Sequence, residues 1–307
     1  MMKKIVYVIM LCVVFIALPI YAIDKNAGTG TAQFLKIPVG ARAVGMGGSF
    51  VGMADNIDAV YWNPAGLTQL ETRELSFQHN QYFQDIRYEY LAVGRPLRSA
   101  YIALSGNYLY LGSDITRTTE TSGGLLDSAD AGKFNVADLA LNLSYAYQMN
   151  LWWSVGATAK WLHLRNDDVT ADGVAFDVGV FWKTPAKGLT LGVTGRNIGP
   201  RLAFISQRNV LPFNFALGAS YKIVPNKLAF NVDVNLPIDN SMQVNLGGEY
   251  WIIPQWSVRG GWMSEDDLDN GWTAGTGFKY LNFTLDYAYQ PRGRLGDTHR
   301  VSAGVKF

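Results

Sequence analysis

The stretch LAFNVDVNL, from Leu228 to Leu236, alternates between two kinds of residue. Every second residue from Leu228 onward is a large apolar one, and the residues between them are Ala229, Asn231, Asp233 and Asn235. Successive side chains of a β-strand point to opposite faces of a sheet, so this pattern predicts a strand with one apolar face and one mostly polar face. A helix would mix the two sets of side chains.

The same period of two recurs up to the final residue and predicts fourteen strands between residues 72 and 307. The predicted strands begin near Thr72, Ile86, Ser99, Phe134, Trp152, Gly173, Leu189, Phe213, Leu228, Met242, Trp256, Gly271, Asn282 and Thr298. Short connections between them interleave with longer ones, such as 112–133 and 199–212. Such an alternation of short and long connections is typical of a transmembrane antiparallel β-barrel with an even number of strands, in which short periplasmic turns alternate with longer external loops.

We therefore expect an all-β barrel in the outer membrane of a Gram-negative bacterium. A soluble β-sandwich also alternates, but it rarely needs fourteen strands in one chain. In a barrel the apolar face contacts outer-membrane lipid, and the tryptophans and tyrosines near the segment ends lie at the two interfaces. The terminal Phe307, which continues the alternation, is expected to be the signal that the outer-membrane assembly machinery recognises.

Residues 1–22 have the form of a secretory signal peptide, with Lys3 and Lys4 before an apolar run and a small residue, Ala22, at the end. The single cysteine, Cys12, would leave with the signal, so no disulfide is expected in the mature chain. Removing the two lysines reduces Lys+Arg from 26 to 24 against 25 Asp+Glu. Such a balance, without a basic run, predicts no nucleic-acid partner.

Residues 23–71 lack any sustained period and are rich in glycine and small apolar residues. Barrels of about eight strands are already filled by side chains, so a fourteen-strand barrel has room for this segment as a hatch that plugs the lumen. Within it, Asn63, Pro64, Ala65 and Gly66 predict a sharp bend that cannot join a strand ladder.

Asp55 and Asp58 precede this bend, and charges enclosed away from water need partners. We expect them to lie against lumen cations or to bond within a tight turn, and a catalytic carboxylate pair is the less favoured interpretation. The candidate partners are Lys160, Lys279, Arg300 and Lys306.

The stretch GARAVGMGGSFVGMADNIDAVYWNPAGL (40–67), followed by FQDIRYEYLAVGRPL (83–97), resembles the N-terminal signature of the PorV/PorQ family, a branch of the FadL-like outer-membrane proteins. The resemblance implies that Asn63, Pro64 and Ala65 match the Asn-Pro-Ala of the family's hatch. It also implies a fourteen-strand barrel. For FadL itself it implies a gated path for long-chain fatty acids, and for PorV-like members a role in type IX secretion.

The sequence offers no pattern for an enzyme, a cofactor or a metal. The runs AGTG (27–30) and GMGG (45–48) lack the spacing and following helix of a dinucleotide fingerprint. The histidines His79, His163 and His299 lie far apart and have no serine at a catalytic spacing. We therefore predict a protein that is not an enzyme and carries neither cofactor nor metal.

Two functions remain open. The barrel transports hydrophobic or amphipathic small molecules, which we favour, or it belongs to a type IX-like secretion system and binds the sorting domains of secreted protein cargo. The predicted external loop GPRLAFISQRNVLP (199–212) contains the apolar residues Leu202, Phe204 and Ile205. Exposed apolar patches often bind ligands, so these residues are the candidate external contact; packing over the barrel mouth is the equal alternative.

Overall fold

The computed structural model describes residues 30–82, 85–112, 115–116, 119–120, 126–127, 133–204, 208–264, 271–293 and 296–307. The predicted signal peptide, residues 1–22, lies outside these ranges. Among the described residues no helix is long and apolar enough to cross a membrane.

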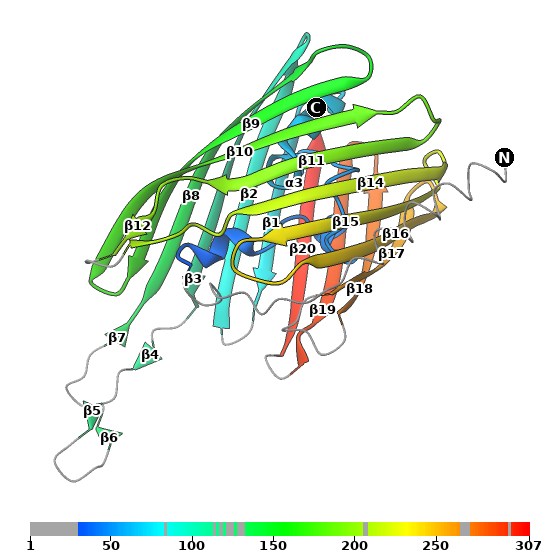
Figure 1. Cartoon of the computed structure of the whole chain (residues 1–307). Helices are drawn as coiled ribbons and strands as arrows, with labels where there is room; N and C mark the ends of the chain where they lie inside the picture. The colour runs from blue at the N-terminus through cyan, green and yellow to red at the C-terminus, as the bar shows by residue number, and fades with distance from the viewer. Residues whose placement is uncertain are drawn as a thin grey trace.

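Fourteen antiparallel strands form a closed barrel (Figure 1). They are β1 (Glu74–Gln81), β2 (Ile86–Leu97), β3 (Ala100–Leu111), β8 (Val136–Gln148), β9 (Trp153–Asn166), β10 (Val169–Lys183), β11 (Leu189–Ile198), β14 (Asn214–Val224), β15 (Leu228–Pro237), β16 (Gln243–Ile253), β17 (Trp256–Met263), β18 (Trp272–Tyr280), β19 (Phe283–Pro291) and β20 (Asp297–Lys306). Pairing of β1 with β20 closes the barrel. The predicted barrel and its strand number are confirmed.

Most strands begin within two residues of the predicted position, but β10 begins at Val169 rather than near Gly173. The reason is a tight turn. β9 and β10 stay paired up to Asn166 and Val169, and Asp167 between them adopts a φ of 60°, a left-handed conformation that aspartate tolerates better than most residues.

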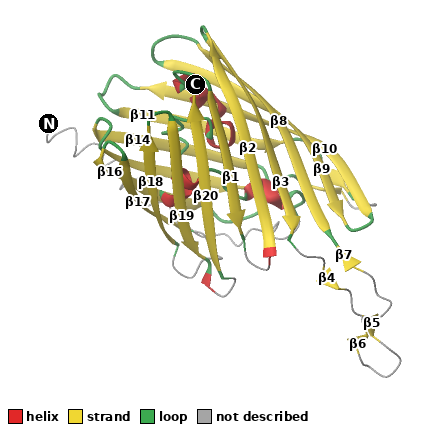
Figure 2. Ribbon diagram, turned by 180° about the vertical axis from the view of Figure 1, so that it is seen from behind, coloured by secondary structure: helices red, strands yellow, loops and turns green. Residues whose placement is uncertain are grey.

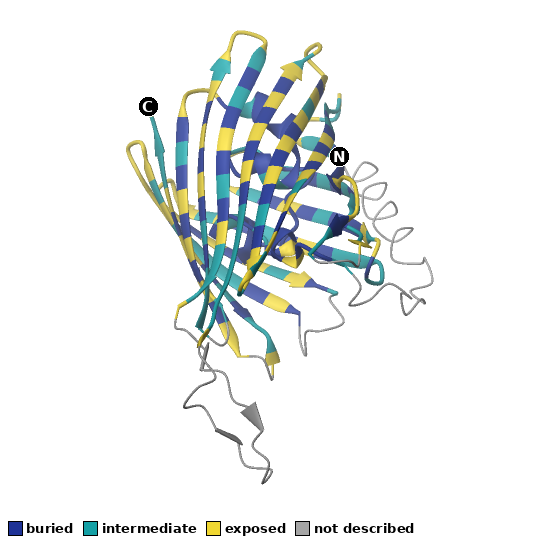
Figure 3. Ribbon diagram, turned by 90° about the vertical axis from the view of Figure 1, so that its left-hand side faces the viewer, coloured by how far each residue is buried: buried dark blue, intermediate teal, exposed yellow. Residues whose placement is uncertain are grey.

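The alternation of the sequence becomes an alternation of burial along each strand (Figure 3). In β15 the predicted lumen residues Asn231, Asp233 and Asn235 are buried, whereas Phe230 and Leu236 are exposed on the outer face. Val234 has the outward place in the register but is also buried. The register of β15 is therefore the predicted one.

The two ends of the barrel differ. At the short-turn end, defined by the connections after β2, β8, β10, β14, β16 and β18, the strands are joined by two to five residues. The opposite, long-loop end carries the extension after β3, with the pairs β4 (Ile115–Thr116) and β7 (Lys133–Phe134), and β5 (Thr119–Glu120) and β6 (Leu126–Asp127) (Figure 2). It also carries the pair β12 (Leu202–Ala203) and β13 (Arg208–Asn209).

Before β1, the chain forms an N-terminal segment, residues 30–73, with four short helices. These are η1 (Gln33–Lys36), α2 (Ala41–Gly45), α3 (Ala59–Trp62) and η2 (Pro64–Gln69). The helix α2 packs against β17 to β20, and η2 packs against β3 and β8 to β10. The segment thus contacts the wall on both sides.

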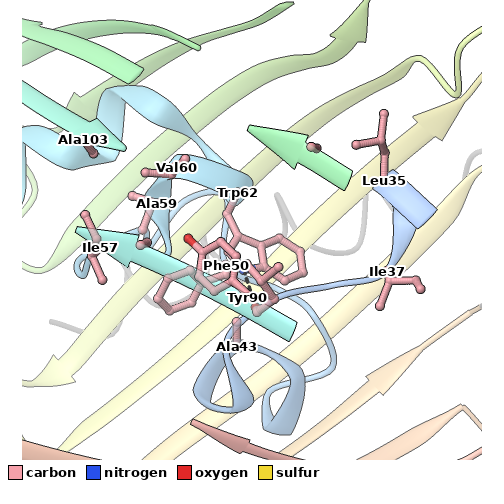
Figure 4. Packing of buried hydrophobic residues seen from close by; sticks show 14 of the residues in the cluster. Leu35, Ile37, Ala43, Phe50, Ile57, Ala59, Val60, Trp62, Tyr90 and Ala103 are labelled. Carbon is pink, nitrogen blue, oxygen red and sulfur yellow. Dashed lines mark hydrogen bonds between the residues drawn. The ribbon is translucent and has the colours of Figure 1, made fainter. Parts of the chain in front are cut away.

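The hydrophobic core of the molecule lies between this segment and the inner face of the barrel. Figure 4 shows Phe50 and Trp62 of the segment gathered at Tyr90 of β2, while Ala103 of β3 lies farther off, on the side of Val60. Small and apolar residues of the segment thus share one buried cluster with residues of the wall.

Candidate functional site

The predicted bend at Asn63 and Pro64 is present and has a clear local cause. Asn63 is extended, with φ −160° and ψ 103°, and its side-chain oxygen accepts a hydrogen bond from Ala65 N at 3.2 Å. Asn63 is thereby the N-cap of η2, and Pro64 occupies the first turn, where a missing N–H costs nothing.

The same asparagine joins the bend to the rest of the lumen. Its Nδ2 atom donates to the carbonyl oxygens of Val51, at 3.2 Å, and Val180 of β10, at 3.1 Å. Asn63 is completely buried. At Gly66 the lack of a side chain matters because of close packing and not because of a turn conformation. A Cβ there would lie 2.5 Å from the carbonyl oxygen of Ala54.

Seven inward-facing glycines of the wall bring the barrel backbone into direct contact with the segment. We call them the glycine seat, and they are Gly156, Gly179, Gly192, Gly218, Gly247, Gly261 and Gly275, on β9, β10, β11, β14, β16, β17 and β18. A Cβ at Gly261 would overlap backbone atoms of Met46 and Gly47, and one at Gly156 would overlap the backbone at Pro64 and Ala65. Glycine is the residue that permits such a close approach.

Side chains of the wall satisfy backbone groups of the segment. Asp233 Oδ2 on β15 accepts from Phe50 N at 2.6 Å and from Val51 N at 2.8 Å. Ser302 Oγ on β20 accepts from Ala41 N at 2.8 Å. The sequence indicated that Asp233 faces the lumen, but it did not identify Asp233 as an acceptor for backbone N–H groups. The one feature that could have suggested this role is that Asp233 is the only charged residue of β15.

Asp55 lies in an ion-pair network. Arg42 contacts Asp55 at 2.6 Å and Glu249 of β16 at 2.7 Å, and Lys222 of β14 contacts Asp55 at 3.1 Å. Burial alone would raise the pKa of Asp55, but the Arg42 and Lys222 cations hold this pKa well below its usual value. Asp55 is therefore ionised.

A lumen cation pairs with Asp55 as expected, but it is Lys222 and not one of the four named candidates, and Asp58 bonds within its own turn to Asn56. Lys160 pairs with Asp177 at 2.8 Å, and Lys306 pairs with Glu74 at 2.7 Å. Asp55 also pairs with Arg42, which belongs to the same N-terminal segment. The alternation along the strands carries no information about contacts inside this segment.

Asp58 has a different environment. Its Oδ2 accepts from Asn56 Nδ2 at 3.1 Å, while Oδ1 has no hydrogen-bond partner within the described part of the chain. Burial, together with the nearby carboxylates of Asp286 and Glu74, raises the pKa of Asp58 to about 6. The two aspartates thus have separate partners and opposite pKa shifts.

A cavity of about 100 Å³ opens at the long-loop end, between η1, α3 and the ends of β11, β14 to β17 and β19. We call it the long-loop cavity. Its lining includes the aromatic rings of Tyr61 and Trp62 and the cations Lys36, Arg196 and Arg292. A smaller enclosed cavity of about 10 Å³, room for one water molecule, lies deeper beside Tyr90.

For Leu202 the structure agrees with the second of the two predicted interpretations, packing over the barrel mouth. Leu202 is buried in the same core cluster as the N-terminal segment and lies against Gly173 of β10. Phe204 is half-buried and packs on that cluster, and Ile205 lies outside the described residues. Apolar side chains at the mouth gain more from this contact than from exposure to water. Their role as ligand contacts stays a prediction.

Phe307 follows the last residue of β20 and completes the barrel seam. Phe307 N donates to Arg73 O at 2.9 Å, and Arg73 N donates to Phe307 O at 3.2 Å. The side chain of Phe307 is exposed. Its role as an assembly signal stays a prediction.

Solved structures share this architecture. The toluene transporter TodX of Pseudomonas putida is similar with a TM-score of 0.63 and 14% identity, over 87% of this chain and 96% of TodX. A TodX deltaS2S3 mutant, a monoaromatic hydrocarbon channel, gives a TM-score of 0.65 and 14% identity over 88% and 99% of the two chains. A FadL homologue of Pseudomonas aeruginosa gives 0.57 and 13% over 94% and 99%.

At these identities the likeness shows a shared fold, the FadL-like barrel. The narrower resemblance to PorV and PorQ is not confirmed. No curated protein matches the chain in sequence. The model of the uncharacterised protein family UPF0164 matches residues 11–175, just over half of the 307 residues. The chain therefore belongs to the UPF0164 family.

Proposed function

We propose that this protein is an outer-membrane channel for hydrophobic or amphipathic small molecules, and that its N-terminal segment is the hatch. The observation that carries the proposal is a barrel lumen filled by a segment of the chain's own N-terminal part, with a cavity left at the long-loop end. TodX and the FadL homologue, which share the fold, support the transport class: TodX is a toluene transporter.

The outer surface of the barrel suits a bilayer. Strands of about 9–11 tilted residues span a membrane, and twelve of the fourteen barrel strands have at least nine residues. Exposed apolar residues lie on the outer face of this wall, among them Leu91, Leu104, Leu141, Leu143, Phe230 and Leu285. Trp153 and Trp182 stack with ring centroids 5.0 Å apart at the short-turn end, where an aromatic girdle is expected.

The described conformation is a closed one under this proposal. A dry cavity of about 150 Å³ accommodates benzene in an engineered protein. The long-loop cavity, at about 100 Å³, is smaller and partly lined by charges, so an aromatic hydrocarbon requires part of the hatch to move.

Leu35 of η1 is the part whose movement would matter most. Leu35 and Tyr61 line both the long-loop cavity and the smaller enclosed cavity, so these two side chains separate them. The helix η1 is held by side-chain contacts of Gln33 and Lys36 with Asp239, at 3.0 and 3.1 Å. It makes fewer contacts with the glycine seat than the rest of the segment does.

Uptake by whole cells tests the proposal. A Gram-negative host without its own uptake channels for these compounds is supplied with the wild-type protein, with Leu35→Trp, or with empty vector, and uptake of radiolabelled toluene is measured. We expect wild-type protein to increase uptake and Leu35→Trp, which enlarges the barrier between the cavities, to remove most of that increase. Equal uptake by wild-type and vector cells would contradict the proposal.

The secretion alternative has its own test. A type IX-like component would bind the C-terminal sorting domains of secreted cargo, and such cargo would be encoded in the same genome. Co-purification of a sorting domain with the full-length protein, without any effect on toluene uptake, would replace the transport proposal.

A further inference from the structure

The smaller enclosed cavity has two chemically different sides. Leu35 and Val60 of the N-terminal segment form an apolar side, to which Tyr61 of the same segment adds its ring. The barrel wall contributes Tyr90 of β2, Ser105 and Asn107 of β3, Asn142 of β8 and Lys160 of β9. A molecule that lies between the two sides therefore contacts apolar atoms of the segment and polar atoms of the wall.

The one cation among the described lining residues, Lys160, already has its counter-charge. Lys160 Nζ contacts Asp177 Oδ2 of β10 at 2.8 Å and donates to Asn197 Oδ1 at 2.7 Å. Both members of the ion pair are buried, and breaking such a pair leaves an uncompensated buried charge. An ionised ligand would have to compete with Asp177 for Lys160, so the cavity favours a neutral group.

Two polar atoms of the wall residues that line the cavity have no hydrogen-bond partner among the described residues, namely the Tyr90 hydroxyl oxygen and Asn142 Oδ1. Tyr90 is 1% exposed and Asn142 is 6% exposed. Asn142 Nδ2, in contrast, donates to Ser105 Oγ at 3.0 Å and to Asn107 Oδ1 at 2.8 Å. Ser105 interacts with the Tyr90 hydroxyl, but the two groups do not meet in hydrogen-bond geometry. Because buried polar groups are normally satisfied, the pair indicates a polar guest.

The chemistry of these two atoms defines the guest. An amide oxygen such as Asn142 Oδ1 only accepts hydrogen bonds, whereas the Tyr90 hydroxyl both donates and accepts. A hydroxyl group can donate to Asn142 and accept from Tyr90, and so can a water molecule. A hydrocarbon makes neither bond, and a carbonyl group or an ionised carboxylate cannot donate to Asn142. Of the groups that an organic ligand carries, a hydroxyl therefore fits best.

We infer that the smaller enclosed cavity is a subsite for the hydroxyl group of a neutral amphipathic molecule, a phenol or an alcohol, with Tyr90 and Asn142 as its hydrogen-bond partners. The inference rests on the proposed function, because the ligand would arrive from the long-loop cavity after Leu35 moves. Its apolar part would contact the side formed by Leu35 and Val60. The subsite thus narrows the substrate class from hydrophobic compounds in general to those that carry a hydroxyl group.

Uptake of two compounds of nearly equal size tests the subsite. Phenol and toluene differ in that phenol has a hydroxyl group where toluene has a methyl group. The host again lacks its own uptake channels for these compounds, and its general porins are deleted. Initial uptake of each radiolabelled compound is measured well below saturation, and the gain over empty vector is calculated. We expect a larger gain for phenol than for toluene with wild-type protein. Tyr90→Phe should lower the phenol gain about three- to tenfold, the usual worth of one neutral hydrogen bond, and leave the toluene gain unchanged.

The control is a second buried tyrosine with an inward place on the wall. Tyr101 of β3 is not among the described lining residues of either cavity, so Tyr101→Phe should keep the wild-type ratio of phenol gain to toluene gain. Tyr90→Phe should fold, because the hydroxyl that it removes has no hydrogen-bond partner in the described part of the chain.

The outcomes separate the subsite from the transport proposal. A toluene gain with the same phenol-to-toluene ratio in wild type and Tyr90→Phe would overturn the subsite and leave transport standing. An equal loss of phenol gain in Tyr101→Phe would overturn the assignment to Tyr90. If neither compound gains over vector, the transport proposal fails and the subsite with it. If Tyr90→Phe does not assemble, the wild-type ratio decides: a phenol gain no larger than the toluene gain refutes the subsite.

Discussion

Adjacent glycines on β17 offer the sharpest test of the contact between the wall and the N-terminal segment. Gly261 faces the lumen, and a Cβ there would overlap backbone atoms of Gly47 and Met46. Gly260 faces outward, and a Cβ there would meet no atom within 4 Å. Gly261→Ala and Gly260→Ala therefore make the same chemical change on the two faces of one strand.

The magnitude follows from the difference between the two variants. Replacing a strand glycine with alanine lowers the entropy of the unfolded chain and stabilises by roughly 0.5–1 kcal/mol, a gain common to both variants. In Gly261→Ala the new methyl must push two backbones apart, because carbon atoms need about 3.5 Å, and such overpacking costs about 1–3 kcal/mol. We expect the free energy of unfolding of Gly261→Ala to lie about 1–3 kcal/mol below that of Gly260→Ala.

Guanidinium unfolding in detergent micelles, followed by tryptophan fluorescence, measures both free energies. Limited proteolysis then shows which part yields, and we expect faster cleavage within residues 40–67 of Gly261→Ala while the barrel keeps its heat-modifiable mobility. Two variants of equal stability and equal protease resistance would refute the close seating of the segment on the wall.

Three further predictions concern single side chains. Asp233→Ala leaves two buried backbone N–H groups without an acceptor and should lower the free energy of unfolding by about 1–3 kcal/mol for each, whereas Asp233→Asn, which keeps one oxygen, should lose less; equal losses would contradict the hydrogen-bond account. Because the folded-state pKa of Asp58 is raised from 3.8 to about 6, the folded protein holds this proton more tightly, so the stability contribution falls as pH rises from about 4 to 6 and the loss is complete above 6. The free energy of unfolding of the wild-type protein, minus that of Asp58→Asn, should therefore fall by about 3 kcal/mol over this pH range. A difference that does not change with pH would refute the raised pKa. Cysteine at Asn231 should react with a water-soluble maleimide faster than cysteine at Phe230 in lipid vesicles when residues 40–67 are deleted, and the reverse order would contradict the register.

The strands were predictable because their signal is local. In β15 each apolar residue and each polar residue reports the face it occupies, and a shift by one residue would place Asp233 in lipid. The bend at Asn63 was predictable for the same reason, since Pro64 restricts its own backbone and that of its neighbour.

The contacts across the lumen were not predictable, because they depend on the depth at which the segment sits. Arg42 meets Asp55 and Glu249 only after α2 is placed against the wall. The alternation along β17 places Gly261 on the inward face and Gly260 on the outward face, but it does not show that the backbone of the segment approaches Gly261. Two interpretations of Leu202 stayed open because an apolar loop residue gives the same pattern whether it covers the mouth or faces solvent.

Single-channel conductance of the barrel without residues 40–67 tests the central claim most directly. The variant is first shown to be folded by its heat-modifiable mobility and then compared with wild-type protein in planar lipid bilayers. If the N-terminal segment closes the lumen, the deletion variant conducts ions through a steady open pore and the wild-type protein does not. A folded deletion variant that is as impermeable as the wild-type protein would contradict the claim.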